Sequence, residues 1–344
     1  MKLSFIIILS HPNYQIKDCL SSLQMSIEKS QSNKLQEFYE IIIGINQEEV
    51  SKVQEFKKII QEFQDKISLL KNIHVELHHF SNLTPAHAKN LCLDQSHADY
   101  ICFLNDDIIL PPDYVSQSLE IIKERPDIDI FGGPDQTYPQ ASFIEHLIGV
   151  TLQSRMATAH TKLRRNFLNS KNSGEQELIL YNIWVKRSLL EKVRFDERLF
   201  HNEENILIDN LRLIDANIKI FPYLHVYHRW PTNPFTLIKD IFFSGFHRAK
   251  SFKYYPQFFK LIFVVPSLLI LYLAFLPIVL LMPLWSTIVL TPLYTYLGLS
   301  IFFSFSVAFK SKSMLLLPLI ILLQIFINIA YGLGFLFGFI QPKN

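Results

Sequence analysis

The chain has 344 residues and a formal net charge of only +2, so it exceeds one average domain and lacks the basic excess expected of a nucleic-acid-binding protein. Its three cysteines are scattered and odd in number, which argues against a disulfide framework and favours a reducing compartment. All 31 acidic residues lie at or before Asp240. Composition therefore divides the sequence into a mixed N-terminal part and an apolar C-terminal part.

The first 240 residues alternate between strand and helix patterns. Strands are predicted at four runs rich in apolar residues, Leu3–Leu9, Tyr39–Ile45, Ile73–Leu77 and Tyr100–Leu104, and Leu3–Leu9 is typical of a buried parallel strand. Helical segments separate these runs, beginning at Asp18, Val50 and Pro85. Strands that alternate with helices predict a doubly wound, largely parallel sheet, so the expected fold class is α/β.

Polar residues end the fourth predicted strand, where Asn105, Asp106 and Asp107 follow Leu104. In open α/β sheets, ligands bind outside the carboxyl ends of the strands. Two adjacent carboxylates at that position suit a divalent cation such as Mg²⁺ or Mn²⁺, which prefers oxygen ligands. Taken alone, the same residues also describe an acidic turn leading into Pro111. Asp106 and Asp107 are therefore candidate metal ligands.

The C-terminal part contains two stretches without a charged residue, 261–309 and 313–342. A membrane-spanning helix needs ~20 mostly apolar residues, so the first stretch is long enough for two helices and the second for one. With Pro283 at a tight turn, the expected spans are 261–281, 285–308 and 314–339. A reentrant hairpin over 261–308 is the alternative.

Basic residues predict the orientation of these spans. By the positive-inside rule, the basic clusters before the first span and after the second lie on the cytoplasmic side. The clusters are Arg248, Lys250, Lys253 and Lys260, then Lys310 and Lys312. The expected organisation is a cytoplasmic domain over 1–240, an amphipathic interfacial segment over 241–260, and a multi-pass membrane region over 261–344 that ends outside. A connecting helix packed on the first domain is the alternative for 241–260.

Seven segments occur in an order that resembles family 2 glycosyltransferases. They are Leu3–Ile8, Ala86–Leu91, Tyr100–Asp107, Phe131–Pro134, Asn182–Ser188, Phe195–Asn205 and Val226–Trp230. The resemblance covers roughly residues 1–250, and it is to the inverting enzymes that carry membrane helices at the C-terminus. It implies a GT-A domain, the Rossmann-like fold of nucleotide-diphospho-sugar transferases, followed by an all-α transmembrane region.

The resemblance also implies roles for charged residues. Asp106 and Asp107 would hold the cation, with the late histidine His228 beside it. Glu204 matches the expected general base, and Glu203 is the second candidate. Without the resemblance, the two glutamates are explained as the acidic first turn of a helix over 203–216. His228 is then explained as a structural histidine.

Further positions would contact the two substrates. Donor contacts are implied for Ser10, Asn46, Lys89, Asn90, Asn105 and Arg229, and acceptor contacts for Gly133, Asn182, Trp184 and Trp230. Asn46 stands where the family usually has a nucleobase-binding Asp, so the base of the donor stays open. Lys89 replaces the family's Arg, and it would act as a point charge rather than a planar fork. Arg229 and Trp230 resemble a pair in processive relatives, but the accompanying Gln is absent.

These observations predict a metal-dependent, membrane-anchored inverting glycosyltransferase. It would move a sugar from a nucleotide-diphosphate donor to a cell-envelope polysaccharide or a lipid-linked acceptor at the cytoplasmic face of the cell membrane. One alternative is a polyprenyl-phosphate glycosyltransferase, for which the basic residues before the first span would serve. Another is an inactive GT-A module that binds a sugar or a partner, suggested by the missing nucleobase Asp. The sequence leaves the sugar and the acceptor open.

Overall fold

The computed structural model describes residues 1–10, 15–32, 37–158, 178–280 and 286–342. It separates into two compact units, which are described one at a time. The first comprises Met1–Pro139 and Leu163–Arg229, and the second comprises Gln140–Lys162 and Trp230–Asn344. The second unit therefore combines a segment from the middle of the chain with the residues from Trp230 onward.

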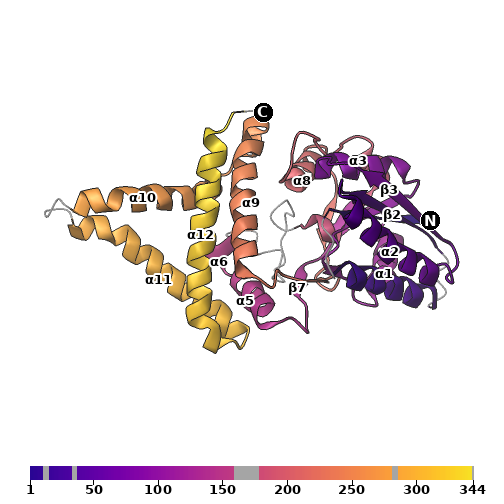
Figure 1. Ribbon diagram of the computed structural model, residues 1–344, viewed down its shortest axis with the longest axis horizontal. Coiled ribbons are helices and arrows are strands. Elements are labelled where there is room, and N and C mark those ends of the chain that lie inside the picture. Colours follow the sequence, from indigo (N-terminus) through magenta and orange to yellow (C-terminus); the bar gives the residue numbers. More distant parts are fainter. Residues whose placement is uncertain (11–14, 33–36, 159–177, 281–285, 343–344) are drawn as a thin grey trace. The chain divides into compact units, whose positions relative to one another are not determined.

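The first unit is built on a mixed sheet that, within the described residues, has seven strands in the order β3-β2-β1-β4-β8-β6-β9 (Figure 1). The strands are β1 (Lys2–Leu9), β2 (Phe38–Asn46), β3 (Ile73–Phe80), β4 (Tyr100–Leu104), β6 (Ile130–Gly132), β8 (Ile183–Lys186) and β9 (Ile218–Ile220). The four strands from β3 to β4 pair in parallel, whereas β8 runs antiparallel to both β4 and β6. The predicted α/β fold is confirmed, and the parallel half coincides with the four apolar runs of the sequence.

A second, smaller sheet follows the end of β4. It consists of β5 (Ile108–Ile109), β10 (Val226–His228) and β7 (Asp135–Thr137), in that order within the described part of the chain. In this sheet β10 runs antiparallel to β5 and parallel to β7. The small sheet therefore connects the chain directly after Asp107 to a segment more than a hundred residues later.

Helices cover both faces of the large sheet. They are α1 (Gln15–Ser32), α2 (Val50–Ile67), α3 (Pro85–Gln95), α4 (Tyr114–Glu124), α7 (Arg187–Leu190) and α8 (Glu203–Leu213), with a 3₁₀ turn at Leu180–Asn182. Apolar side chains of α1, α2 and α4 pack on one face, and those of α3, α7 and α8 pack on the other. Helix α3 begins as its sequence predicts: the Thr84 hydroxyl accepts a hydrogen bond from the His87 amide, and Pro85 occupies the first turn.

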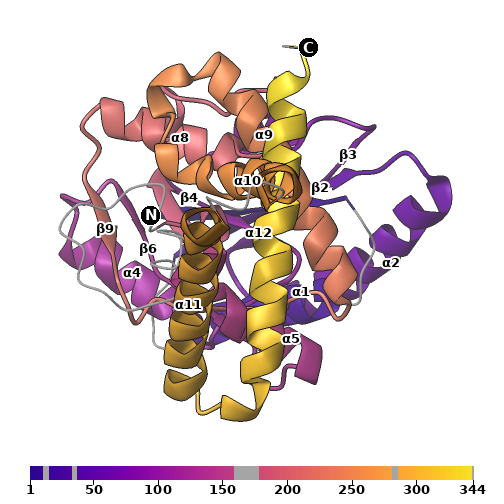
Figure 2. The same ribbon diagram turned by 90° about the vertical axis from the view of Figure 1, so that its left-hand side faces the viewer.

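The second unit is helical. Its elements are α5 (Phe143–Leu152), α6 (Arg155–Thr158), α9 (Pro234–Tyr254), α10 (Val265–Leu280), α11 (Ser286–Lys310) and α12 (Leu317–Ile340), with 3₁₀ turns at Pro256–Phe258, Leu261–Phe263 and Met314–Leu316. Within this unit α9 and α12 lie side by side, whereas α10 lies across the axis of α12 (Figures 1 and 2). Two stretches of the described residues are long and apolar enough to cross a membrane, Ile288–Lys310 and Met314–Ile340, and α10 is shorter.

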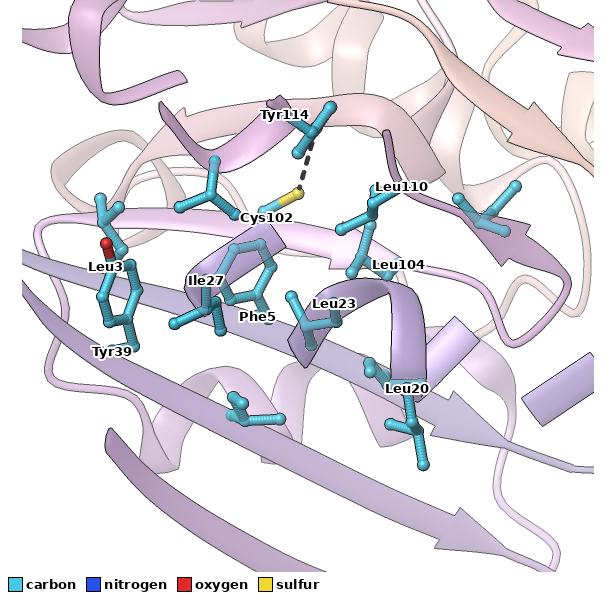
Figure 3. Close-up of a cluster of buried hydrophobic side chains, with 14 of the residues drawn as sticks. Leu3, Phe5, Leu20, Leu23, Ile27, Tyr39, Cys102, Leu104, Leu110 and Tyr114 are labelled. Carbon is cyan, nitrogen blue, oxygen red and sulfur yellow. Dashed lines mark hydrogen bonds between the residues drawn. The ribbon is translucent and has the colours of Figure 1, made fainter. Parts of the chain in front are cut away.

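The first unit has a continuous apolar core beneath α1 (Figure 3). Leu23 and Ile27 of α1 pack beside Phe5 of β1, and all three side chains are fully buried. The Cys102 thiol and the Tyr114 hydroxyl, both buried, lie 3.7 Å apart in the same core. Close packing of this kind supports the parallel strands, which are also paired with one another.

Glycines of α12 allow α9 and α12 to approach backbone to backbone. A Cβ at Gly334 would overlap the carbonyl oxygen of Phe242, and one at Gly338 would overlap that of Phe246. Gly245 of α9 meets the carbonyl oxygen of Tyr331 in the same way. Small residues spaced four apart are a known means of close helix packing in apolar surroundings. These three residues, Gly245, Gly334 and Gly338, are called the glycine seam below.

We expect Gly334→Ala to lower the free energy of unfolding by about 1–2 kcal/mol, because overpacking costs ~1–3 kcal/mol and the helix propensity of alanine returns up to ~1 kcal/mol. Gly298→Ala in α11 is the matched control, since a Cβ there would meet no atom within 4 Å. The control should be neutral or stabilising. Thermal unfolding of both variants in detergent measures the difference, and equal midpoints would show that the seam is not tightly packed.

Candidate active site

Asp107 and His228 are brought together by the small sheet. His228 is paired with Ile108 across β10 and β5, so its ring lies next to the residue that precedes Ile108. The imidazole Nε2 is 3.1 Å from Asp107 Oδ2, although the two residues are 121 positions apart in the sequence. The backbone amide of Arg229 donates to the Asp107 carbonyl oxygen at 3.0 Å. Both expected metal-site segments therefore meet at the carboxyl end of β4.

The other carboxylate oxygen of Asp107 has a different environment. Oδ1 is buried and accepts no hydrogen bond from any described residue. A buried polar group without a partner costs ~1–3 kcal/mol, and more when it is charged. Tyr181 stacks on His228 with ring centroids 5.2 Å apart and planes 8° apart, and the Tyr181 hydroxyl donates to Asp135 Oδ2 at 2.9 Å. The His228 imidazole is thus held in place by Tyr181. Asp107 Oδ1, in contrast, has no hydrogen-bond donor among the described residues.

The residues at this edge fit a divalent cation that is shared with a substrate. Asp106 and Asp107 would supply carboxylates, and His228, which lies against Asp107, would supply an imidazole nitrogen. Within the described residues, however, there is no preformed group of three His, Cys, Asp or Glu side chains that could hold a metal ion by itself. Mg²⁺ is commonly held by one or two carboxylates together with substrate phosphates and water. Asp107 Oδ1 is the atom that such a cation would satisfy.

Burial raises the pKa of the Cys19 thiol well above its usual value, and the neighbouring charges of Asp106 and Asp107 raise it further. The Cys19 sulfur lies on α1, 3.4 Å from the carbonyl oxygen of Asn105. The thiol therefore stays protonated beneath the acidic turn. The sequence contained no signal for this neighbour, because Cys19 reads as an ordinary apolar helix position.

Arg229 is fixed at the same edge by contacts within the first unit. Its Nη1 donates to Asp18 Oδ2 at 2.9 Å, and its guanidinium lies 5.0 Å from the centre of the Tyr138 ring. Asp18 stands in the first turn of α1, where an acidic residue is favoured by the helix dipole. From the sequence alone, Asp18 is explained by its place at the start of a helix. Its pairing with Arg229, a predicted donor-binding residue, could therefore not be predicted.

A second charged cluster joins α3 to the start of α8. Lys89 Nζ lies 2.9 Å from Glu203 Oε1 and 3.1 Å from Glu204 Oε1. The side chains of Lys89 and Glu203 are 9% and 6% exposed, whereas that of Glu204 is 30% exposed. Burial lowers the pKa of Lys89, but the charges of the two carboxylates more than offset this, and the pKa ends above its usual value. Glu204 is therefore the more exposed carboxylate of the pair.

Asn90, the neighbour of Lys89, is engaged with protein. Its side-chain nitrogen donates to the Phe195 carbonyl oxygen and to Glu197 Oε1, each at 2.9 Å, and its side-chain oxygen accepts from the Phe195 amide. Asn90 thereby ties α3 to the segment that leads into α8. We assign it to positioning Glu203 and Glu204 rather than to donor contact.

A pocket of about 440 Å³ opens at the carboxyl ends of β1 and β2. It is lined by Ser10, Asn46, Gln47, Glu48, Asn82, Leu83, Pro85, Phe200 and His201. Two predicted donor-binding residues, Ser10 and Asn46, lie in it, and Asn105 stands at the end of β4. The Asn46 carboxamide is paired with the backbone of Leu83, donating at 2.8 Å and accepting at 2.9 Å. It keeps one N–H and one lone pair for a ligand.

The four residues expected to contact the acceptor do not form a surface. Asn182 and Trp184 are fully buried in the first unit, and Asn182 is bonded to Tyr114 and to the Leu224 carbonyl oxygen. Gly133 is packed against the Leu224 carbonyl oxygen, where a Cβ would not fit. Trp230 is buried in an apolar cluster of the second unit. These positions are core residues, so the acceptor assignment is withdrawn.

The sheet order, the acidic end of β4 and the second sheet define a glycosyltransferase of the GT-A class. The model of the family "Glycosyl transferase family 2" matches residues 16–194, and the chain belongs to that family. No curated protein sequence matches the chain.

One of the similar solved structures has a TM-score above 0.5 and shows the same fold. The mannosyltransferase PcManGT from Pyrobaculum calidifontis, in complex with GDP-Man and Mn²⁺, is 11% identical with a TM-score of 0.57, and the match covers 97% of this chain and 86% of that one. S. aureus TarS is 16% identical with a TM-score of 0.45, over 71% of this chain and 39% of that chain. A structure of its residues 1–349 with UDP is 16% identical with a TM-score of 0.47, over 71% and 64% of the two chains. The match spans less than two thirds of either TarS chain.

We expect Lys89→Met to lower the free energy of unfolding by ~3–5 kcal/mol, because it leaves two carboxylates facing each other in a largely buried site. The additional change Glu203→Gln should restore part of this loss. Lys29→Met is the matched control: Lys29 pairs with Asp113 at 2.6 Å, but both side chains are about half exposed. That change should cost less than ~1 kcal/mol. Chemical unfolding of the three variants measures the effect, and equal losses for Lys89→Met and Lys29→Met would disprove the buried cluster.

Proposed function

We propose that this family 2 glycosyltransferase moves a sugar from a nucleotide-diphosphate donor to an acceptor hydroxyl with inversion at the anomeric carbon. The observation that carries the proposal is the pairing of Asp107 with His228 at the carboxyl end of β4, which leaves Asp107 Oδ1 in need of a cation. Family membership supports the reaction class. The complex of PcManGT with GDP-Man and Mn²⁺ supports a nucleotide-sugar donor and a divalent cation.

Each charged group then has a defined task. A cation held by Asp106, Asp107 and His228 would neutralise the diphosphate as it departs. Ser10 and Asn46 would line the donor pocket. Glu204 accepts the proton of the acceptor hydroxyl as its oxygen attacks the anomeric carbon and the bond to the diphosphate breaks. Lys89 and Asn90 hold the segment that carries Glu204, and Glu203 completes the buried ion pair.

We further propose that the helical second unit attaches the enzyme to the cytoplasmic face of the cell membrane, where a cell-envelope polysaccharide or a lipid-linked saccharide is the acceptor. The two long apolar helices support attachment. A lipid phosphate as acceptor would require free cations near the membrane. Of the four residues considered for that role, Arg248 lies 4.2 Å from the Phe263 ring centre and Lys253 donates to the Gly338 carbonyl oxygen at 3.0 Å. We therefore favour a hydroxyl acceptor over a polyprenyl phosphate.

The metal assignment is tested at Asp107. Asp107→Ala should abolish Mn²⁺-dependent binding of nucleotide-diphosphate sugars, because it removes the oxygen that the cation satisfies. Isothermal titration with UDP- and GDP-hexoses, with and without Mn²⁺, measures the loss. Asp113→Ala is the control, since this aspartate is half exposed and pairs only with Lys29 among the described residues. Unchanged affinity and unchanged Mn²⁺ dependence in Asp107→Ala would remove the metal assignment.

Glu204→Gln tests the general base. This change keeps the size of the side chain but removes its capacity to accept a proton, so turnover should fall by ~10²–10⁴-fold with little change in donor affinity. Glu203→Gln should reduce turnover less. Mn²⁺-dependent hydrolysis of the donor, with water in place of the acceptor, supplies the assay. A larger loss in Glu203→Gln, or wild-type turnover in Glu204→Gln, would place the base elsewhere.

A further inference from the structure

The helices of the second unit constrain how this protein meets a membrane. Helix α9 lies beside α12 from one end to the other. Leu237 shares an apolar cluster with Leu323, near the starts of the two helices. Phe252 packs against Phe335 at 6.3 Å between ring centres, and Lys253 Nζ donates to the Gly338 carbonyl oxygen at 3.0 Å. With the glycine seam between these points, the two helices run in the same direction as a tight pair (Figure 1).

Helix α9 is not a membrane-spanning sequence. It carries ionisable side chains along its length: Lys239, Asp240, His247, Arg248, Lys250 and Lys253. At 1.5 Å per residue, Lys239 and Lys253 are about 21 Å apart along the axis, which is less than the ~30 Å thickness of the hydrocarbon layer. If α12 crossed the bilayer, all of these groups would enter the hydrocarbon with it. Ionisable groups at that depth are costly and rare.

Helix α12 has one exposed apolar stripe. Large apolar side chains that are at least one third exposed occur at Leu319, Leu322, Phe326, Phe337, Phe339 and Ile340. All of these except Phe339 fall on one face at 3.6 residues per turn. The opposite side of the helix is taken up by the contact with α9. A helix pair with an apolar stripe and a basic partner helix matches an arrangement that lies flat in the headgroup region.

The pair α10–α11 has a different direction and a different surface. Ser267, at the foot of α10, donates to the Gly332 carbonyl oxygen of α12 at 3.1 Å, and Ser300 of α11 accepts from Gln324 at 2.6 Å. Figure 1 shows α10 lying across the axis of α12, and Figure 2, turned by 90°, views α10 nearly end-on while α12 stays side-on. Neither helix carries a charged residue before Lys310. The described part of α10 has 16 residues and is about 24 Å long, which is less than the ~30 Å thickness of the hydrocarbon layer.

We infer that the protein is monotopic: the α9–α12 pair lies in the plane of one leaflet, and the α10–α11 pair enters that leaflet without crossing the bilayer. The surface fits an anionic leaflet, because no acidic residue follows Asp240 while Lys250, Lys310 and Lys312 of the second unit are not buried. This inference rests on the proposed membrane attachment. It replaces the three spans expected from the sequence and places the end of α12 on the same side as Lys310.

Spin labels attached to introduced cysteines test the inference in vesicles of phosphatidylcholine and phosphatidylglycerol. The native cysteines, Cys19, Cys92 and Cys102, are buried and can stay. Labels replace Leu319, Phe326, Phe337 and Ile340 on α12, Phe275 on α10, and Asp113 in the first unit as an aqueous reference. Depth is read from collisions with oxygen and with a water-soluble nickel complex.

For a helix that lies flat, the four α12 labels should agree in depth to within about one helical turn, ~5 Å. The Phe275 label should lie about 12 Å deeper, since it is eight residues beyond the foot of α10. A spanning α12 would instead place Leu319 and Ile340 about 32 Å apart across the bilayer, with Phe326 deep between them. That profile would overturn the monotopic arrangement and leave membrane attachment intact. Aqueous accessibility at every label, Phe275 included, would overturn attachment itself.

Discussion

The pairing of β10 with β5 is the constraint on which the candidate site depends. These strands have only three and two residues, yet their register decides which side chains meet. With His228 opposite Ile108, the imidazole reaches Asp107, and the Arg229 amide closes onto the Asp107 carbonyl oxygen. A slip of one residue would turn His228 to the other face of the small sheet. The geometry is therefore fixed by backbone hydrogen bonds, and side chains complete it.

The two charged clusters of the site differ in how completely they are neutralised. Lys89 meets two carboxylates, so that cluster is closed and holds α3 against α8. Asp107 has one oxygen paired and one buried oxygen without a hydrogen bond from the described residues. A low local dielectric strengthens good pairs and penalises incomplete ones. Binding of a positively charged species beside Asp107 Oδ1 would remove the free-energy cost of this unpaired buried oxygen.

Much of the fold was predictable because the four parallel strands from β3 to β4 are rich in apolar residues, and Asp106 and Asp107 stand where one of them ends. Strands β6, β8 and β9, of which β8 is antiparallel to its neighbours, have three or four residues, too few to show a period. Asn182 and Trp184 were misassigned for a related reason. A polar or aromatic residue in a family segment looks the same whether it faces a substrate or the core, and the partners that bury Asn182, such as Leu224, come from distant parts of the chain. The contact between Lys89 and α8 could not be predicted either, because no sequence pattern within α3 indicates which distant residues Lys89 will meet.

The glycine seam separates two requirements on helix α12: close packing against α9 and a suitable outward-facing surface. Because α9 and α12 meet through backbone atoms at Gly245, Gly334 and Gly338, their association depends little on the side chains that point away from it. Those outward positions can change while the helix pair keeps its spacing. The seam has no such freedom, since any side chain would separate the backbones. With the membrane attachment proposed above, adaptation to a new lipid environment would be available to one face of α12 and closed to the other.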